Sequence, residues 1–313
     1  MEIQVAAETC GAICAAQQRL EAYPGKEIAL GSLKVSRVLP VRDHRLIGPW
    51  CFLDRFGPLS FTEGSPMDVA PHPHIGLQTV TWLLEGEVQH DDSLRCEAIA
   101  RPGVVNVMTA GRGVAHAEQT PKNHTGRLSG VQLWVALPGR DREMDPAFQQ
   151  VAEIPLVELR GGTVEVFAGT FGGVSSAARH FSPILGADLR VHPRESLTIP
   201  LDEKWEHAVL LLQGDCAIDG QNLAEGVLYY LGTERCAVEF NSREGGRLLL
   251  IGGPPFPEKI LMWWNFVART PEEIAAARAD WEAHRRFGDV PSYAGTRLSA
   301  PELMRLARPN PLS

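Results

Sequence analysis

Short apolar segments separated by turn residues dominate this chain and constrain its fold more than any other feature. Each segment is rich in β-branched, aromatic or aliphatic side chains, and Gly, Pro or Asp lies at its ends. The 30 Gly and 23 Pro are spread along the chain, as expected where many tight turns join short strands. The pattern predicts an all-β fold built as sandwiches or barrels. The clearest strand segments are residues 79–84, 131–137, 163–168, 207–212, 227–231 and 247–251.

Two segments are expected to be helical instead. Thr270 is a favourable N-cap, and it is followed by Pro at the first helical position and by two acids in the first turn. This helix is expected to continue through Phe287 and to end at Gly288. A weaker helix is expected over residues 8–22.

One β-unit occurs twice in the sequence. The apolar segment that ends at Gly86 aligns with the one that ends at Gly214, and a second turn glycine follows each of them, at Gly103 and Gly226. The length of 313 residues is also about twice that of a typical domain. We therefore expect two domains, residues 1–155 and residues 156–313, with the helix and a tail at the end of the second.

Charge and composition exclude several classes of function. The net charge is −8 and no block of Lys or Arg occurs, so direct binding to nucleic acid is not expected. No apolar run is long enough to span a bilayer, and the first twenty residues lack the pattern of a signal peptide, which predicts a cytoplasmic protein without membrane association. Of the six Cys only Cys10 and Cys14 are close in sequence, so free thiols are expected rather than a zinc site.

The strongest chemical signal is a pair of motifs about forty residues apart. His72 and His74 are separated by one residue, and so are His116 and Glu118. Side chains alternate along a strand, so each pair presents both of its members on one face. Imidazole and carboxylate together favour a divalent transition metal. A single histidine is more often a surface or hydrogen-bonded residue, but four such residues at paired spacing predict one mononuclear metal site inside a barrel.

The surroundings of the two motifs fit this geometry. Pro73 cannot donate to a sheet, which suits a strand start or an edge strand. Gly111 and Gly113 permit the tight turn before the second pair. His90 lies beside Asp91 and Asp92 and is expected in an exposed turn. The apolar walls of the site are expected to come from Val80, Trp82 and Leu83.

Residues 71–92 and 102–120 resemble the signature of the pirin family, two-domain members of the cupin superfamily. Weaker resemblance extends to residues 53–58 and to residues 252–274, whereas residues 261–266 look unlike the usual family tail. The resemblance implies two cupin-type antiparallel β-barrels face to face, with a metal in the first barrel only. That metal is usually iron, with Cu, Ni, Mn or Zn as alternatives. The ligands implied are His72, His74, His116 and Glu118.

The resemblance leaves two functions open. Some pirin-like proteins cleave the flavonol quercetin with molecular oxygen, which implies a dioxygenase with Glu118 as both ligand and catalytic base. The human member is a cofactor of transcription regulators and some bacterial members affect central metabolism, which implies instead an iron-binding, redox-sensitive regulator that contacts a protein partner. A purely structural metal is a third reading.

Two further observations concern the predicted metal site. Relatives generally carry Glu shortly after the histidine pair, whereas this chain has Gln78, a neutral amide that can hydrogen-bond near the metal but cannot act as a base. In the second repeat the alignment sets Pro200, Asp202 and Glu206 against His72, His74 and Gln78. We therefore expect the second barrel to bind no metal.

Overall fold

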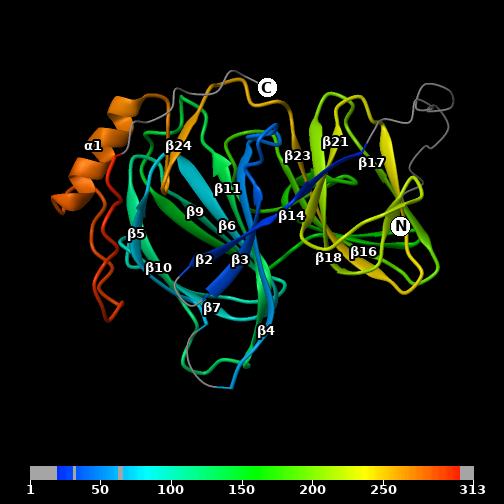
Figure 1. Ribbon diagram of the computed structural model, residues 1–313, viewed down its shortest axis with the longest axis horizontal. Coiled ribbons are helices and arrows are strands. Elements are labelled where there is room, and N and C mark those ends of the chain that lie inside the picture. The colour runs from blue at the N-terminus through cyan, green and yellow to red at the C-terminus, as the bar shows by residue number, and fades with distance from the viewer. Residues whose placement is uncertain (1–19, 31–32, 63–65, 304–313) are drawn as a thin grey trace.

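The structure is a computed structural model, and it describes residues 20–30, 33–62 and 66–303. It consists of two β-lobes that lie side by side (Figure 1). All six segments with the clearest strand pattern lie in strands, apart from Leu137 at the end of one of them. The first lobe combines a seven-stranded antiparallel sheet, in the order β12-β9-β6-β11-β4-β3-β2, with a four-stranded sheet, β5-β10-β7-β8. Its strands are β2 (Lys26–Leu30), β3 (Leu33–Leu39), β4 (Trp50–Ser60), β5 (Asp68–His74), β6 (Leu77–Gly86), β7 (Val88–Asp92), β8 (Glu97–Ala100), β9 (Val105–Thr109), β10 (Val114–Gln119), β11 (Arg127–Ala136) and β12 (Ala147–Val151).

The second lobe repeats this plan with a larger sheet, β1-β21-β18-β23-β16-β14-β13, and a four-stranded sheet, β17-β22-β19-β20. The two aligned glycines have the same role, since Gly86 ends β6, Gly214 ends β18, and both have positive φ. The strands of this lobe are β1 (Glu21–Pro24), β13 (Leu156–Leu159), β14 (Gly162–Phe171), β15 (Val174–Ser175), β16 (Leu185–Val191), β17 (Ser196–Pro200), β18 (Glu206–Gly214), β19 (Ala217–Ile218), β20 (Gln221–Asn222), β21 (Val227–Gly232), β22 (Ala237–Asn241) and β23 (Gly246–Gly253).

Each end of the described chain packs on the lobe formed mainly by the other half. β1 pairs with β21 of the second lobe, so residues 21 and 22 are strand rather than part of the helix expected over 8–22; residues 8–19 lie outside the described residues. At the other end, the hairpin β24 (Leu261–Trp263) and β25 (Phe266–Ala268) packs on the first lobe, where Val267 N–H donates to the carbonyl of Ile75 at 3.1 Å. The division at residue 155 stays a prediction.

Helix α1 (Pro271–Glu282) begins as the sequence indicates, with the Thr270 hydroxyl accepting from the Glu273 N–H at 3.3 Å. Its predicted extension to Phe287 is wrong. The chain leaves the helix at Ala283, and His284 and Arg286 adopt positive φ, which a helix does not allow. The segment folds back instead, and Phe287 stacks on Phe266 at 5.8 Å between ring centroids.

The largest apolar cluster lies between the two lobes. Val80 and Trp82 of β6 belong to it, and Trp82 stacks on Phe167 of β14 with ring centroids 5.1 Å apart. The Trp82 indole N–H donates to Asp188 at 2.8 Å. The expectation that these two residues form walls of the metal site is therefore wrong, because their face of β6 points toward the other lobe. Leu83 packs inside the first lobe.

Two further expectations can be compared with the structure. Among the residues that it describes, no helix is long and apolar enough to cross a membrane. Cys51, Cys96 and Cys216 are free thiols as expected, whereas Cys236 is disulfide-bonded, which corrects the expectation for that residue. Cys10 and Cys14 lie outside the described residues.

Candidate metal centre

The two sequence motifs meet on one face of the smaller sheet of the first lobe. β5 is the edge strand of this sheet, as Pro73 requires, and it pairs with β10 so that His72 lies opposite His116. A bulge between His116 and Glu118 lets the strand bend while both side chains stay buried. Gly111, with a φ of +51°, forms the turn before β10, and a Cβ there would lie 2.2 Å from the carbonyl oxygen of Met144.

Three histidines form a compact cluster. His72, His74 and His116 each offer a ring nitrogen, and these atoms all lie within 4.8 Å of one another. The Nε2 atoms of His74 and His116 are 3.0 Å apart. Two nitrogens that bind one ion at right angles, with bonds of about 2.1 Å, are about 3.0 Å apart, so this separation suits a shared metal.

The opposite edge of each ring is held by an acceptor. The Nδ1 atom of His72 is 2.9 Å from the Ala70 carbonyl, and that of His74 is 3.0 Å from the Asn265 carbonyl. The Nδ1 atom of His116 is 3.4 Å from Nδ1 of His90. A proton on Nδ1 leaves Nε2 with a free lone pair, which is the form that binds a metal. The donor set therefore fits a transition metal.

Burial keeps these side chains in the form that a metal needs. It lowers the pKa of His72 to about 4, and it lowers the pKa values of His74 and His116 well below the usual value, with the neighbouring histidines adding to the effect. The three imidazoles are thus neutral at pH 7. Burial also raises the pKa of Glu118, while the nearby His90 imidazole acts in the opposite direction.

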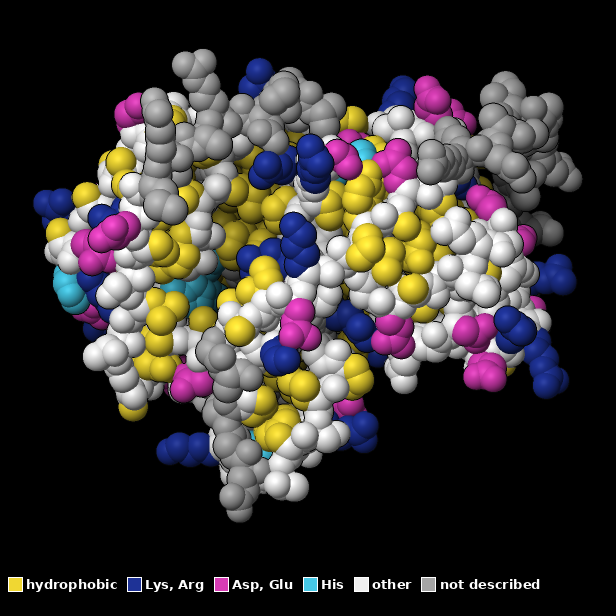
Figure 2. Space-filling model, in the orientation of Figure 1, with side chains coloured by type: hydrophobic (Ala, Val, Ile, Leu, Met, Phe, Trp, Pro, Cys, Tyr) yellow, Lys and Arg dark blue, Asp and Glu magenta, His cyan; other side chains and the backbone are white. Residues whose placement is uncertain are grey.

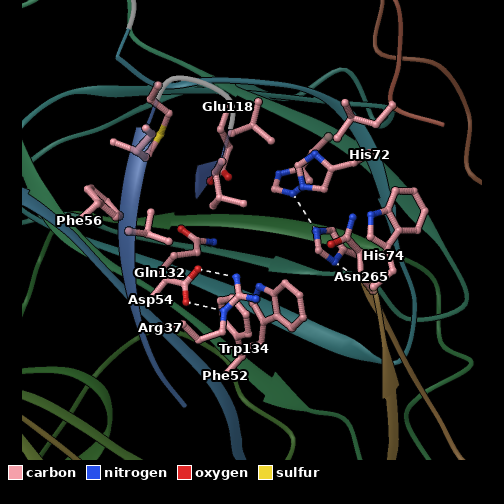
Figure 3. Close-up of a pocket in the computed structure, with 18 residues that line it drawn as sticks. Arg37, Phe52, Asp54, Phe56, His72, His74, Glu118, Gln132, Trp134 and Asn265 are labelled. Carbon is pink, nitrogen blue, oxygen red and sulfur yellow. Dashed lines mark hydrogen bonds and ion pairs between the residues drawn. The ribbon is translucent and has the colours of Figure 1, made fainter. Parts of the chain in front are cut away.

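Glu118 lies close to the histidines but outside their cluster. It lines the same cavity, and its carboxylate points inward from β10 (Figure 3). Its carboxylate oxygens do not belong to the group of ligand atoms that lie within 4.8 Å of one another. Its role as fourth ligand and as base stays a prediction.

The cluster opens into a cavity of about 360 Å³. Phe52 and Trp134 form a stacked pair on its wall, with centroids 4.0 Å apart, and Trp134 meets His74 edge-on at 5.3 Å. The Arg37 guanidinium lies 4.5 Å from the Phe52 centroid and binds both carboxylate oxygens of Asp54 at 2.8 Å (Figure 3). On the surface, histidine side chains are visible in the first lobe among hydrophobic ones (Figure 2).

Sequence reasoning misplaced Gln78. Its amide donates to the Thr109 hydroxyl at 2.9 Å and to the Arg179 carbonyl at 3.0 Å, and its oxygen faces Nδ1 of His180 at 3.0 Å. Gln78 lies on the same face of β6 as Val80 and Trp82, toward the second lobe. It does not support the histidine cluster, so the lack of a carboxylate at this position removes nothing from that cluster.

His90 was also misplaced. It is buried in β7 rather than exposed in a turn, and its ring contacts His116 and stacks on Phe148. The signal for this was present, because His90 and Asp92 have the same alternate spacing as His72 and His74. Trp264 and Asn265 of the β24–β25 hairpin also line the cavity, and no local pattern placed them there.

The comparisons with known proteins agree on the family. Residues 32–135 match the family described as Pirin, and residues 186–288 match the Pirin C-terminal cupin domain. The chain is 43% identical to a Pseudomonas aeruginosa protein named "putative quercetin 2,3-dioxygenase", over 87% of each chain. It is 31% identical to human pirin, over 79% of this chain and 86% of that protein.

Solved structures give the same result. A quercetin 2,3-dioxygenase from Acinetobacter baumannii is 40% identical, with a TM-score of 0.90 over 93% of this chain and 97% of that one. A bacterial pirin from Escherichia coli, solved with nickel(II), is 16% identical, with a TM-score of 0.60 over 76% of this chain and 100% of that one, and at that identity it shares the fold alone. The chain belongs to the pirin family, and its two lobes are the two cupin domains of that family.

Proposed function

We propose that this protein is a metal-dependent dioxygenase that cleaves the ring of a flavonol such as quercetin with O₂. The observation that carries the proposal is the combination of a three-histidine cluster with an aromatic-walled cavity that opens from it. The cavity volume of about 360 Å³ lies within the range of sites that hold small organic ligands. The names of the relatives from Pseudomonas and Acinetobacter support the same reaction class.

In this proposal His72, His74, His116 and Glu118 hold one divalent transition metal. Iron is the proposed ion, and Cu, Ni, Mn and Zn are the alternatives that metal analysis decides among. When bound, such an ion supplies a Lewis acid for a substrate hydroxyl and a redox centre for reaction with O₂. Imidazole and carboxylate donors suit all of these ions, so the donor set alone does not select one.

The other side chains of the cavity have roles that the geometry supports. Phe52 and Trp134 provide an aromatic wall against which a planar ring system can pack. Glu118, whose carboxylate faces the cavity, accepts the proton of the substrate hydroxyl. Buried apolar residues that line the cavity, among them Leu33 and Val35, limit access of water.

The test is aerobic turnover of quercetin, followed by the loss of flavonol absorbance, with protein loaded separately with each of the five metals. We expect turnover with at least one metal and none above the metal-free background for His116→Ala. The matched control is His192→Ala, an exposed histidine of the second lobe, which should retain full activity. No turnover under any loading would contradict the enzyme and leave the regulatory function as the alternative.

A further inference from the structure

The three clustered histidines differ in the group that their Nδ1 atoms face. His72 and His74 face main-chain carbonyls, which can only accept a hydrogen bond. His116 instead faces the imidazole of His90, which can either donate or accept. The orientation and proton position of His116 therefore depend on the state of a second side chain.

The next contact fixes that state. Nε2 of His90 lies 3.1 Å from Oδ2 of Asp92, and a carboxylate accepts but does not donate. A His90 ring that carries one proton must then carry it on Nε2, which leaves Nδ1 as an acceptor. The Nδ1–H of His116 donates to it, and Nε2 of His116 is left free to face His74. The three side chains thus form a hydrogen-bonded chain in which His116 donates to His90 and His90 donates to Asp92.

Asp92 is the last acceptor of this chain, and main-chain N–H groups fix its carboxylate. Its Oδ1 accepts the main-chain N–H groups of Leu94 and Cys96, both at 2.9 Å, and the side chain is fully buried. The pairing of β10 with β7 sets His116 opposite Asp92 and Glu118 opposite His90. The His90 ring also stacks on Phe148, with an interplanar angle of 17°. Packing and strand register therefore both orient the His90 ring.

We infer that His90 and Asp92 are positioning residues, which hold His116 in the orientation and tautomer that bind the metal through Nε2. The inference rests on the metal site proposed above and not on the dioxygenase reaction. Hydrogen-bond partners behind metal-ligating histidines typically contribute 10- to 100-fold to metal affinity.

The decisive variant is Asp92→Asn, tested with cobalt(II) as the probe. An amide can donate to Nε2 of His90, which would move the proton of His90 to Nδ1 and set it against Nδ1–H of His116. We expect cobalt affinity, measured by competition with a chromophoric chelator, to fall about 10- to 100-fold. The visible absorption of bound cobalt should change as well, because the coordination geometry changes.

The matched control is Asp91→Asn. Asp91 is the buried neighbour on the same strand and loses the same charge, but its side chain accepts from Gln89 and points to the opposite side. It should leave both cobalt affinity and the absorption spectrum close to those of the unmodified protein. Equal losses in the two variants would overturn the inference, because they would reduce the effect to charge alone.

A second pair of variants, at His90, tests the same inference in case Asp92→Asn does not fold. His90→Phe keeps the stacking on Phe148 but removes the acceptor, whereas His90→Gln keeps an acceptor oxygen. We expect the Phe variant to bind cobalt more weakly than the Gln variant, with both folded by circular dichroism. Full affinity in His90→Phe would overturn the inference. If the wild-type protein binds cobalt but does not turn over quercetin, the proposed dioxygenase reaction is contradicted and the present inference is unaffected.

Discussion

The two lobes have the same strand plan but different interiors. In the first lobe, β5 and β10 turn His72, His74, His116 and Glu118 toward a cavity. In the second lobe, β17 and β22 have the same places in the smaller sheet, and their inward residues pack in an apolar core; these residues are Leu197, Ile199, Val238 and Phe240. The comparison shows that equivalent strands of the small sheet carry clustered histidines beside a cavity in one lobe and core residues in the other.

The largest expected effect concerns the histidine cluster of the first lobe. His116→Ala removes one of three clustered imidazoles and also the ring that faces Nδ1 of His90. We expect metal affinity to fall by more than about 100-fold, beyond the loss typical of an outer hydrogen-bond partner. Competition with a chelator measures this. His192→Ala should bind metal as tightly as the wild type, and similar affinity in both variants would show that the metal lies elsewhere.

The next effect concerns the core side. Phe240 is fully buried in the second lobe, and Phe240→Ala should lower the free energy of unfolding by about 3–5 kcal/mol. Phe56→Ala should cost less, because one side of Phe56 already faces the cavity of the first lobe. Denaturant titration of both variants gives the comparison. An equal or larger loss for Phe56→Ala would mean that the first lobe is as tightly filled as the second.

A smaller effect tests the contacts between the lobes. Gln78→Glu replaces the amide that donates to the Arg179 carbonyl with a group that repels it, and should cost about 1–3 kcal/mol of unfolding free energy. Glu206 is the residue of the second repeat that aligns with Gln78, and it accepts from the Gly48 N–H at 2.7 Å. Glu206→Gln keeps an acceptor there, so its cost in unfolding free energy should be smaller. Neither change should alter metal affinity. Tighter metal binding in Gln78→Glu would contradict the conclusion that Gln78 lies apart from the metal site.

The last effect is a dependence of stability on pH in the metal-free protein. Burial lowers the pKa of His207 in the second lobe to about 4, against about 6.5 for a histidine of the unfolded chain. Between these values only the unfolded chain binds the proton. The contribution of His207 is therefore fully present above pH 6.5 and is lost as the pH falls through 4.

Thermal unfolding between pH 7 and pH 4 measures this dependence. His207→Gln should make this dependence less steep, while His192→Gln, at an exposed position, should not change it. His72 in the first lobe, whose pKa burial also lowers to about 4, contributes a slope of the same sign. An unchanged slope in His207→Gln would contradict the assignment to His207.

The sequence predicted the strands and the histidine cluster because both depend on local patterns. Alternation along β5 and β10 is enough to bring two pairs of side chains to one face. The positions of Gln78 and His90 depend instead on which face of β6 meets the second lobe and on how β7 pairs with β10. These pairings are long-range features, so the alternate spacing of His90 and Asp92 indicates that the two share a face but not that this face meets His116. Likewise, Asn265 reaches His74 from 191 residues away along the chain.

The central claim is tested most directly by elemental analysis of protein purified without added metal. One transition-metal ion per chain in the wild type, and none in His116→Ala, is the result that a single site in the first lobe predicts. Two ions per chain would contradict the difference between the lobes. A protein that holds no transition metal under any loading would contradict the metal site itself.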